Sequence, residues 1–570
     1  MKSIFISLSL ILSFVLRAQH PTLPEDVKSN IEKRIEYGNT PSIVVGIIDE
    51  HGTSYFNFGT AKTEGKPVDE HSIYEIGSIS KVFTATLLAD NIVKKQMSAD
   101  DPAQLYLPEK VHLPTYEGKS ITLGNLSDHT SSLPRMPSNF DPADPMNPYA
   151  DYSLDQLYDF LSTVKLERAI GSEYEYSNLA VGLLGQILAQ KAEVDYEQLM
   201  LTKIATPLHM TETKVTMDPN MLSHLAYGHS NGTVVPNWDL PTMAGAGAIK
   251  SSTHDLLLFL AANIGMTTSD LTPAMELAHQ VRHNKAGNTR VGLGWHISKG
   301  EHGDLIWHNG ATGGYRAFMG FIKEDKLGVV VMTNSDADID DIGFHLLYPA
   351  RPLAEVKPKV TTWIKETIDE HGTKKLVDRF EKMKKEKADY YSIDENEINA
   401  LGYWYMNERK NLPAATVIFE INRNEFPASF NVYDSYGEAL MNAGNNKDAI
   451  PHYKKSLELN PGNTNAIDML AKMGVVYEVK TPELNEELLK TYDGTYEIAP
   501  GFNIVITHQG TQLFGQATGQ SQFELFPKSD SEFYLKVVEA RVTFVKNGDG
   551  DMVMTLYQNG AVLPGKKILQ

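Results

Sequence analysis

Two residues, Ser78 and Lys81, have the types and the spacing of a nucleophile and its base. They lie three residues apart in a segment whose apolar residues recur at helical steps, so both side chains should project from one face of a helix, one turn apart. A serine hydroxyl is a weak nucleophile until a base takes its proton, and a lysine becomes such a base when burial and nearby cations lower its pKa. The start of a helix also offers Ser78 a backbone N–H and a positive field, which suit an oxyanion hole. The pair predicts acyl transfer through Ser78.

The same tetrapeptide pattern occurs a second time, at Ser162 and Lys165. Chance alone predicts about two or three Ser-x-x-Lys patterns in a chain of this length. Context separates the two copies, because Gly77 precedes Ser78 at a change from loop to helix, whereas Ser162 lies inside a predicted helix. We therefore interpret Ser162 as an exposed helix residue and Ser78 as the nucleophile.

Two further motifs follow in order along the chain: Tyr176-Ser177-Asn178 and His308-Asn309-Gly310. With them the sequence resembles the penicillin-recognising serine hydrolases, in particular the group of class C β-lactamases and D-alanyl-D-alanine carboxypeptidases. That family is marked by Ser-x-x-Lys, then Tyr-x-Asn or Ser-x-Asn, then Lys-Thr-Gly or His-x-Gly. A softer match is the segment 126–134, which looks like the family's His-Thr-Ser-Gly-Leu-Pro loop except that Ser132 replaces the glycine. The resemblance covers about residues 24–347.

The resemblance implies a direct part in catalysis for three side chains. Ser78 would attack a carbonyl carbon, and Lys81 and Tyr176 would together remove the serine proton and relay it to the leaving group. Which of these two is the base is disputed within the family, and the sequence leaves both open.

The resemblance also implies roles for the residues around them. Asn178 would hydrogen-bond the lysine and the acyl side of the substrate, and His308 would orient the catalytic tyrosine or the far end of the substrate. Gly310 would keep its strand close to the substrate. The backbone N–H groups of Ser78 and Ala311 would form the oxyanion hole.

These residues need elements that hold them together, and the hydropathy pattern indicates several folded units after a leader. Residues 20–350 have the pattern of strands, then many helices, then strands, and the resemblance implies an α/β domain of the β-lactamase/transpeptidase type, with an antiparallel sheet and a helical subdomain. Residues 351–395 form a predicted helical linker. Residues 396–475 contain a repeat of 34 to 35 residues that resembles the tetratricopeptide repeat. Residues 484–570 consist of short alternating runs and predict an all-β barrel or sandwich.

Residues 1–19 have the pattern of a signal peptide. Lys2 precedes an apolar run from Ile4 to Leu16 that is too short to span a bilayer, and Ala18 provides a small residue for cleavage. We expect an exported protein, periplasmic or secreted, with no membrane span after the signal peptide is removed.

Composition excludes several classes of function. The formal net charge is −20 and no basic stripe occurs, so nucleic acid is not an expected partner. The chain has no cysteine, which excludes a thiol nucleophile, a thiolate metal site and a disulfide. His51 and His71 each follow an Asp-Glu pair, but no His-Glu-x-x-His or comparable ligand spacing exists. We expect no metal and no cofactor.

The chemistry of an acyl-serine is general, so the sequence leaves the substrate open. We favour a peptidase or esterase that cleaves amide or ester bonds, in D-amino peptides of the peptidoglycan type or in small esters, because accessory domains of this size suggest duties beyond drug hydrolysis. A β-lactamase that opens a lactam is the alternative. A hypothesis of another class is a non-hydrolytic penicillin-binding or scaffold protein, in which the tetratricopeptide-like repeats bind a protein or peptide partner.

Overall fold

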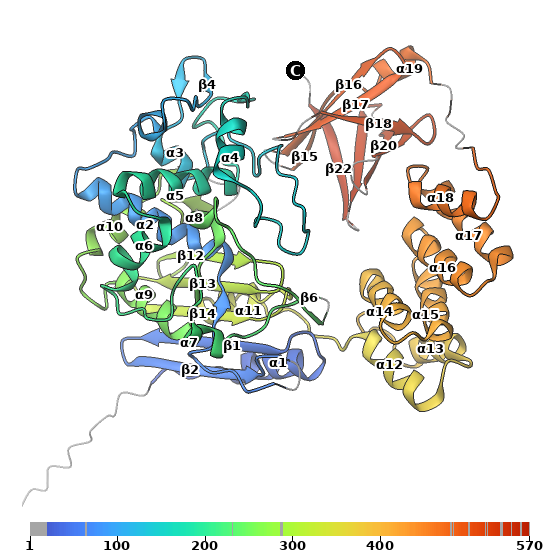
Figure 1. The fold of residues 1–570 in the computed structure, drawn as a ribbon, viewed down its shortest axis with the longest axis horizontal. Coiled ribbons are helices and arrows are strands. Elements are labelled where there is room, and N and C mark those ends of the chain that lie inside the picture. Colours follow the sequence, from blue (N-terminus) through green and yellow to red (C-terminus); the bar gives the residue numbers. More distant parts are fainter. Residues whose placement is uncertain are drawn as a thin grey trace, which may run out of the picture.

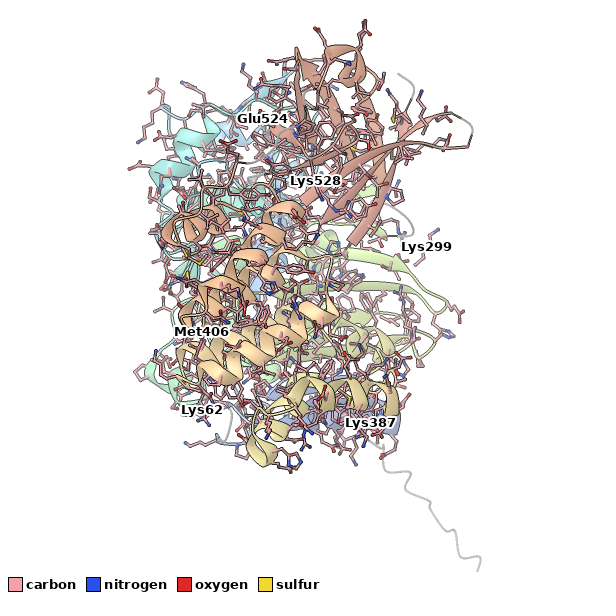
Figure 2. The ribbon with its side chains drawn as sticks, turned by 90° about the vertical axis from the view of Figure 1, so that its right-hand side faces the viewer. Lys62, Lys299, Lys387, Met406, Glu524 and Lys528 are labelled. Atoms are coloured by element: carbon pink, nitrogen blue, oxygen red, sulfur yellow. The ribbon has the colours of Figure 1, made fainter. Side chains whose placement is uncertain are left out.

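The structure is a computed structural model. It describes residues 20–62, 65–230, 232–284, 289–478, 482, 484–499, 502–518, 520, 522–535, 540–548, 550–558 and 561–568. The predicted signal peptide, residues 1–19, lies outside these ranges. In Figure 1 a helical unit and a barrel lie on the same side of a larger N-terminal α/β domain. Figure 2, turned by 90°, shows the helices around Lys387 and Met406 below the barrel that contains Glu524 and Lys528.

The N-terminal domain is built around an eight-stranded antiparallel sheet, which confirms the predicted fold class. Its strands are β1 (Ser42–Asp49), β2 (Gly52–Gly59), β9 (His283–Asn284), β10 (Thr289–Val291), β11 (His296–Lys299), β12 (Asp304–Ala311), β13 (Arg316–Ile322) and β14 (Leu327–Thr333). Their order in the sheet is β2-β1-β14-β13-β12-β11-β10-β9. The N-terminal hairpin thus pairs with the last strand of the domain, with Val45 opposite Val331.

Helices cover both faces of this sheet: α1 (Glu25–Glu36) and α11 (Asp340–Leu347) on one, and α2 (Ser80–Val93) and α9 (Thr253–Ile264) on the other. Successive residues of a strand point to opposite faces. Ile43 and Val45 of β1 accordingly pack with α1 and α11, whereas Val44 belongs to the larger core that contains α2 and α9. Because both of its faces are buried, β1 is apolar along almost its whole length.

The remaining helices and several two-residue strands form the helical subdomain beside the sheet. They are α3 (Leu123–Ser127), α4 (Leu154–Leu161), α5 (Asn178–Ala192), α6 (Tyr196–Met200), α7 (Pro219–Ser223), α8 (Ala244–Gly247), α10 (Thr272–Ala278), and the two-residue strands β3 (Tyr74–Glu75), β4 (Thr115–Tyr116), β5 (Lys119–Ser120), β6 (His229–Ser230), β7 (Thr233–Val234) and β8 (Lys250–Ser251). The ribbon of β3 and β8 leads directly into the segment that contains Ser78.

Residues 360–472 form the helical unit. Its helices are α12 (Val360–His371), α13 (Leu376–Glu386), α14 (Glu395–Asn407), α15 (Leu412–Glu425), α16 (Phe430–Asn442), α17 (Asn446–Leu459) and α18 (Thr464–Lys472). The helices of the predicted linker 351–395 are part of it, because Ile364 of α12 and Phe380 of α13 are buried in one core with Ile418 of α15. That these helices are tetratricopeptide repeats stays a prediction.

The C-terminal strands close into a barrel, which decides between the barrel and the sandwich. The strands are β15 (Gly494–Ala499), β16 (Phe502–Gln509), β17 (Gln512–Ala517), β18 (Phe523–Pro527), β19 (Glu532–Tyr534), β20 (Ala540–Lys546), β21 (Met552–Gln558) and β22 (Ala561–Ile568), preceded by α19 (Glu486–Lys490). Residues of β16 alternate between the barrel core and the outside, and Ile504 and Ile506 are among those that lie in the core. Across the described ranges, no helix combines the length and the apolar character needed to cross a membrane.

Candidate active site

Ser78 lies in the 3₁₀ turn Gly77–Ile79, directly before α2. The helix proper starts at Ser80, slightly later than the sequence predicts. Gly77 has a φ of 49°, and a Cβ on it would lie 2.7 Å from both the backbone nitrogen and the backbone oxygen of Ala311. Only glycine permits both this φ and this close approach. The turn therefore holds Ser78 directly against the end of β12.

Lys81, in the first turn of α2, is completely buried. Its Nζ lies 3.0 Å from Ser78 Oγ and donates a second hydrogen bond of 2.7 Å to the carbonyl of Ala246. Burial, and next the positive charge of Arg135, hold the pKa of Lys81 well below its usual range. Within the described ranges no carboxylate forms an ion pair with this amine, so no negative charge offsets the cost of burying it as a cation. The arrangement favours a neutral amine beside the serine hydroxyl.

Tyr176 lies over the same amine, with Lys81 Nζ 4.8 Å from the centre of its ring. Burial raises the pKa of Tyr176, and its hydrogen bond with Ser78 and the charge of Arg135 oppose this rise only in part. The phenol therefore stays protonated at neutral pH. His129 stacks on the tyrosine, with ring centroids 4.5 Å apart, and His129 Nδ1 accepts a hydrogen bond of 3.1 Å from the Ser177 N–H.

The loop that contains His129 has the backbone conformation that its sequence suggests. Ser132, at the position where the family's loop has glycine, adopts a φ of 63°, in the left-handed region that glycine occupies most easily. Its hydroxyl donates a hydrogen bond of 2.9 Å to the carbonyl of Arg168, which ties the loop to the segment before Tyr176. The structure thus keeps the turn despite the loss of the glycine.

Gly310 brings β12 against the nucleophile turn, and its predicted closeness to the substrate stays a prediction. A Cβ on Gly310 would collide with the carbonyl of Ile76 and would lie 3.1 Å from the backbone nitrogen of Ser78. The pairing of β11 with β12 runs only from Asp304 to Trp307, so residues 308–311 extend past β11 along the edge that faces Ser78. This places the backbone of Ala311 next to that of Ser78, where both N–H groups were expected to form an oxyanion hole.

The contacts of Asn178 differ from the predicted ones, which included a hydrogen bond to the lysine. Among the described residues, the hydrogen bonds of Lys81 Nζ are those to Ser78 and Ala246, and neither reaches Asn178. Asn178 Nδ2 instead lies 3.8 Å from the sulfur of Met136, and its side chain also hydrogen-bonds Tyr149. Its helix position explains this, because Asn178 is the first residue of α5 and faces the 134–152 loop.

His308 is almost completely buried, so of its two predicted roles the structure favours the one toward the tyrosine. Its ring centroid lies 6.3 Å from that of Tyr176, and it stacks on His296 with ring centroids 4.9 Å apart. A side chain with about 1% exposure does not reach the far end of a substrate.

Sequence reasoning missed two residues near the nucleophile. The guanidinium carbon of Arg135 lies 5.2 Å from the centre of the Tyr176 ring and depresses the pKa of Lys81. Its only sequence signal is its place directly after the loop 126–134. Glu75, three residues before Ser78, is buried and accepts hydrogen bonds from the Trp238 N–H at 2.7 Å and from Asn237 Nδ2 at 3.0 Å. It thereby fixes the 237–240 loop beside the site.

The site opens onto a recess of about 30 Å³ whose lining includes Ser78, Trp238 and Ala311. This is room for roughly one water-sized group. A carbonyl oxygen fits such a space, whereas the rest of a substrate must bind outside it.

An antiparallel sheet flanked by helices, with serine, lysine and tyrosine at the end of one strand, defines a serine hydrolase of the penicillin-recognising class. The beta-lactamase family model matches residues 27–346, which is more than half of the chain. The protein therefore belongs to the beta-lactamase family, as the sequence motifs predict. A second model, a domain of unknown function (DUF3471), matches residues 478–560 and so covers most of the barrel.

Relatives within the family are named for two activities. The D-alanyl-D-alanine-carboxypeptidase/endopeptidase AmpH of Escherichia coli (strain K12) is 28% identical over 346 residues, which cover 57% of this chain and 88% of the relative. A beta-lactamase of the same organism is 26% identical over 347 residues, covering 54% and 88%. The crystal structure of a beta-lactamase/D-alanine carboxypeptidase from Pseudomonas syringae aligns with a TM-score of 0.50 at 23% identity, over 57% of this chain and 98% of that one. That alignment shows the fold, and the names leave the substrate open.

Proposed function

We propose that this protein is an exported serine hydrolase that forms an acyl-enzyme on Ser78 and cleaves amide or ester bonds in peptides or small esters. The observation behind this proposal is the distance of 3.0 Å between Ser78 Oγ and the Nζ of a completely buried Lys81. Because burial and Arg135 lower the pKa of the lysine while burial raises that of Tyr176, we assign the general base to Lys81. Tyr176 then passes the proton to the leaving group.

The surroundings of Tyr176 favour a peptide substrate with a negatively charged group. Arg135 is exposed, and in the part of the chain that the structure describes it forms no ion pair. It lines a pocket of about 230 Å³ together with Tyr176 on one side and Phe502 and Gln520 of the C-terminal domain on the other. A hydrogen bond of 2.9 Å from Gln516 to Glu167 joins the two domains beside this pocket. A guanidinium there suits a carboxylate such as the end of a D-alanyl peptide, with the barrel as one wall.

Covalent labelling tests the nucleophile. Purified protein lacking residues 1–19 is treated with a fluorescent penicillin and with a fluorophosphonate, and the adduct is located by peptide mass spectrometry. We expect one adduct, on Ser78, that is absent in Ser78→Ala and undiminished in Ser162→Ala. An adduct of equal yield in Ser78→Ala would rule out the assignment.

A hydrolysis panel then separates the substrate classes. It compares nitrocefin, p-nitrophenyl acetate and butyrate, and D-alanyl peptides with a C-terminal carboxylate or amide. We expect the peptide carboxylate to be cleaved faster than its amide. Turnover of nitrocefin above that of all peptides and esters would favour the β-lactamase. Export is checked by locating the full chain after cell fractionation.

A further inference from the structure

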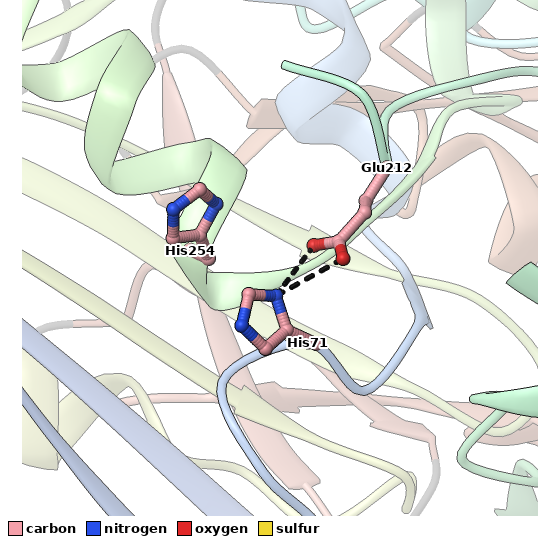
Figure 3. Close-up of side chains that lie close together, drawn as sticks. All are labelled: His71, Glu212 and His254. Atoms are coloured by element: carbon pink, nitrogen blue, oxygen red, sulfur yellow. Dashed lines mark hydrogen bonds and ion pairs between the residues drawn. The ribbon is translucent and has the colours of Figure 1, made fainter. Parts of the chain in front are cut away.

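A group of potential metal ligands lies outside the active site, at the base of α9 (Figure 3). His71 Nδ1 lies 3.0 Å and 3.1 Å from the two carboxylate oxygens of Glu212, and the ring centroid of His254 lies 5.1 Å from that of His71. One ligand atom from each residue falls within 4.8 Å of the others. Each of the three residues comes from a different segment of the chain, so no short sequence motif predicts the group.

Neighbouring residues hold the ligands in place. The Ser252 hydroxyl donates a hydrogen bond of 2.6 Å to Glu212 Oε2. Asp255, which is completely buried, accepts the backbone N–H of Glu212 at 2.7 Å through one oxygen. Its other oxygen lies 3.1 Å from His254 Nδ1. A carboxylate on one ring nitrogen is the usual support for a histidine that binds metal through its other nitrogen.

We propose that His71, Glu212 and His254 form a binding site for a divalent transition-metal ion of the Zn²⁺ type. Two histidines and one carboxylate, with further positions for water, are a ligand set that Zn²⁺ accepts. Two ligands about 2.0–2.1 Å from a tetrahedral ion lie roughly 3.3 Å apart, close to the separation of His71 Nδ1 and Glu212 Oε1. The His254 side chain is 35% exposed and Asp255 holds its Nδ1, so its other ring nitrogen, Nε2, is left to complete the set.

An ion pair between His71 and Glu212 is the simpler interpretation of the short distances. It explains neither the position of His254 nor the buried Asp255 that fixes both this ring and the backbone of Glu212. No metal was expected because the sequence has no His-Glu-x-x-His or comparable spacing, whereas the fold assembles this group from three separate segments.

The site is connected to the nucleophile through the ribbon of β3 and β8. His71 precedes β3 and His254 follows β8, while at the other end Glu75 pairs with Lys250 and the chains continue to Ser78 and Ala246. These are the two residues whose oxygens contact Lys81 Nζ. Seven extended residues span at most about 23 Å, so the metal would act at a distance, by fastening the two strands together.

Metal binding is measured directly on the full mature chain, prepared without a histidine tag and stripped with a chelator. We expect one equivalent of Zn²⁺ by calorimetry, a rise in Tm of roughly 5 °C at saturating Zn²⁺, and visible absorption bands on adding Co²⁺. Binding of less than about 0.2 equivalents by the wild-type chain would refute the site.

Single variants locate the ion. His71→Gln and His254→Gln, and also Glu212→Gln, are expected to lower the Zn²⁺ affinity by about 100-fold or more. The matched control is His51→Gln, an exposed histidine beside Glu50 on the β1–β2 turn, which should keep wild-type affinity. Circular dichroism and Tm in chelator verify that each variant is folded. Unchanged affinity in the three folded cluster variants, or an equal loss in His51→Gln, would contradict the assignment.

Discussion

The chain contains the pattern Ser-x-x-Lys in two places that differ in surroundings rather than in residue type. At the first, Lys81 is completely buried and its Nζ lies 3.0 Å from Ser78 Oγ. At the second, Ser162 is exposed at the end of α4 and donates its hydrogen bond to the Tyr158 carbonyl at 2.9 Å, while Lys165 is exposed in the following loop. The difference shows that a lysine becomes a base through the burial and charges around it, and that the spacing only brings it within reach.

The largest expected effect comes from removing the buried amine. Lys81→Ala and Lys81→Arg should lower the acylation rate by about 10³-fold or more, because general-base catalysis is lost and a guanidinium stays protonated. Rates are measured by single-turnover labelling with a fluorescent penicillin and by release of p-nitrophenol from the acetate ester.

The second pattern supplies the matched control for this experiment. Lys165→Ala removes a lysine at the same spacing from a serine and should leave both rates within about twofold of the wild type, as surface substitutions usually do. Turnover retained in Lys81→Arg would show that a neutral amine is not required at this position.

The next largest effect is expected at Gly310, which brings β12 against the turn of the first pattern. Gly310→Ala places a methyl group against the carbonyl of Ile76 and near the backbone nitrogen of Ser78. The strand must move away, so we expect a loss of about 10²-fold in kcat/KM, with the N–H of Ala311 displaced from the reacting carbonyl. Steady-state hydrolysis of p-nitrophenyl acetate measures the loss.

A glycine with no close neighbours is the control that shows whether the loss of kcat/KM in Gly310→Ala is specific to that position. Gly548, in the turn after β20, has open space around its Cβ position, so Gly548→Ala should keep wild-type kcat/KM and Tm. Full activity in Gly310→Ala would mean that the close approach of β12 to the nucleophile turn is not needed.

Sequence patterns anticipated the site well where it depends on short motifs in a known order. Ser78 with Lys81 and Gly310 came from such motifs, and the structure brings them together. Asn178 was predicted to contact the lysine, but it begins α5 and points to the neighbouring loop. Arg135 could not be assigned a role, because its effect on Lys81 depends on the folding of a loop over the tyrosine.

The fold too was predicted from the sequence where it depends on local patterns, and was not predicted where it depends on contacts between distant segments. Strands with regular alternation predicted the barrel, whereas β22 gives a weak strand signal because Pro564 and Gly565 interrupt its pattern. The closed barrel needs β22, which pairs with both β21 and β15. The cluster of His71, Glu212 and His254 is the extreme case, since its ligands are 141 and 42 residues apart along the chain.

The smallest expected effect concerns Arg135, the cation whose charge acts on Lys81 of the first Ser-x-x-Lys pattern. Arg135 helps to hold the pKa of Lys81 low, so Arg135→Gln should let that pKa rise. A base with a higher pKa is protonated over a wider range, and the acid limb of kcat/KM, which reports the free enzyme, should move to higher pH. Arg135→Lys keeps the charge and should leave the limb near its wild-type position. With p-nitrophenyl acetate, which has no carboxylate for Arg135 to bind, the shift reflects the lysine alone. If the acid limb of kcat/KM stays in place in Arg135→Gln, or moves to lower pH, burial by itself sets the pKa of Lys81. The two Ser-x-x-Lys patterns would then differ in the solvation of the lysine rather than in the charges around it.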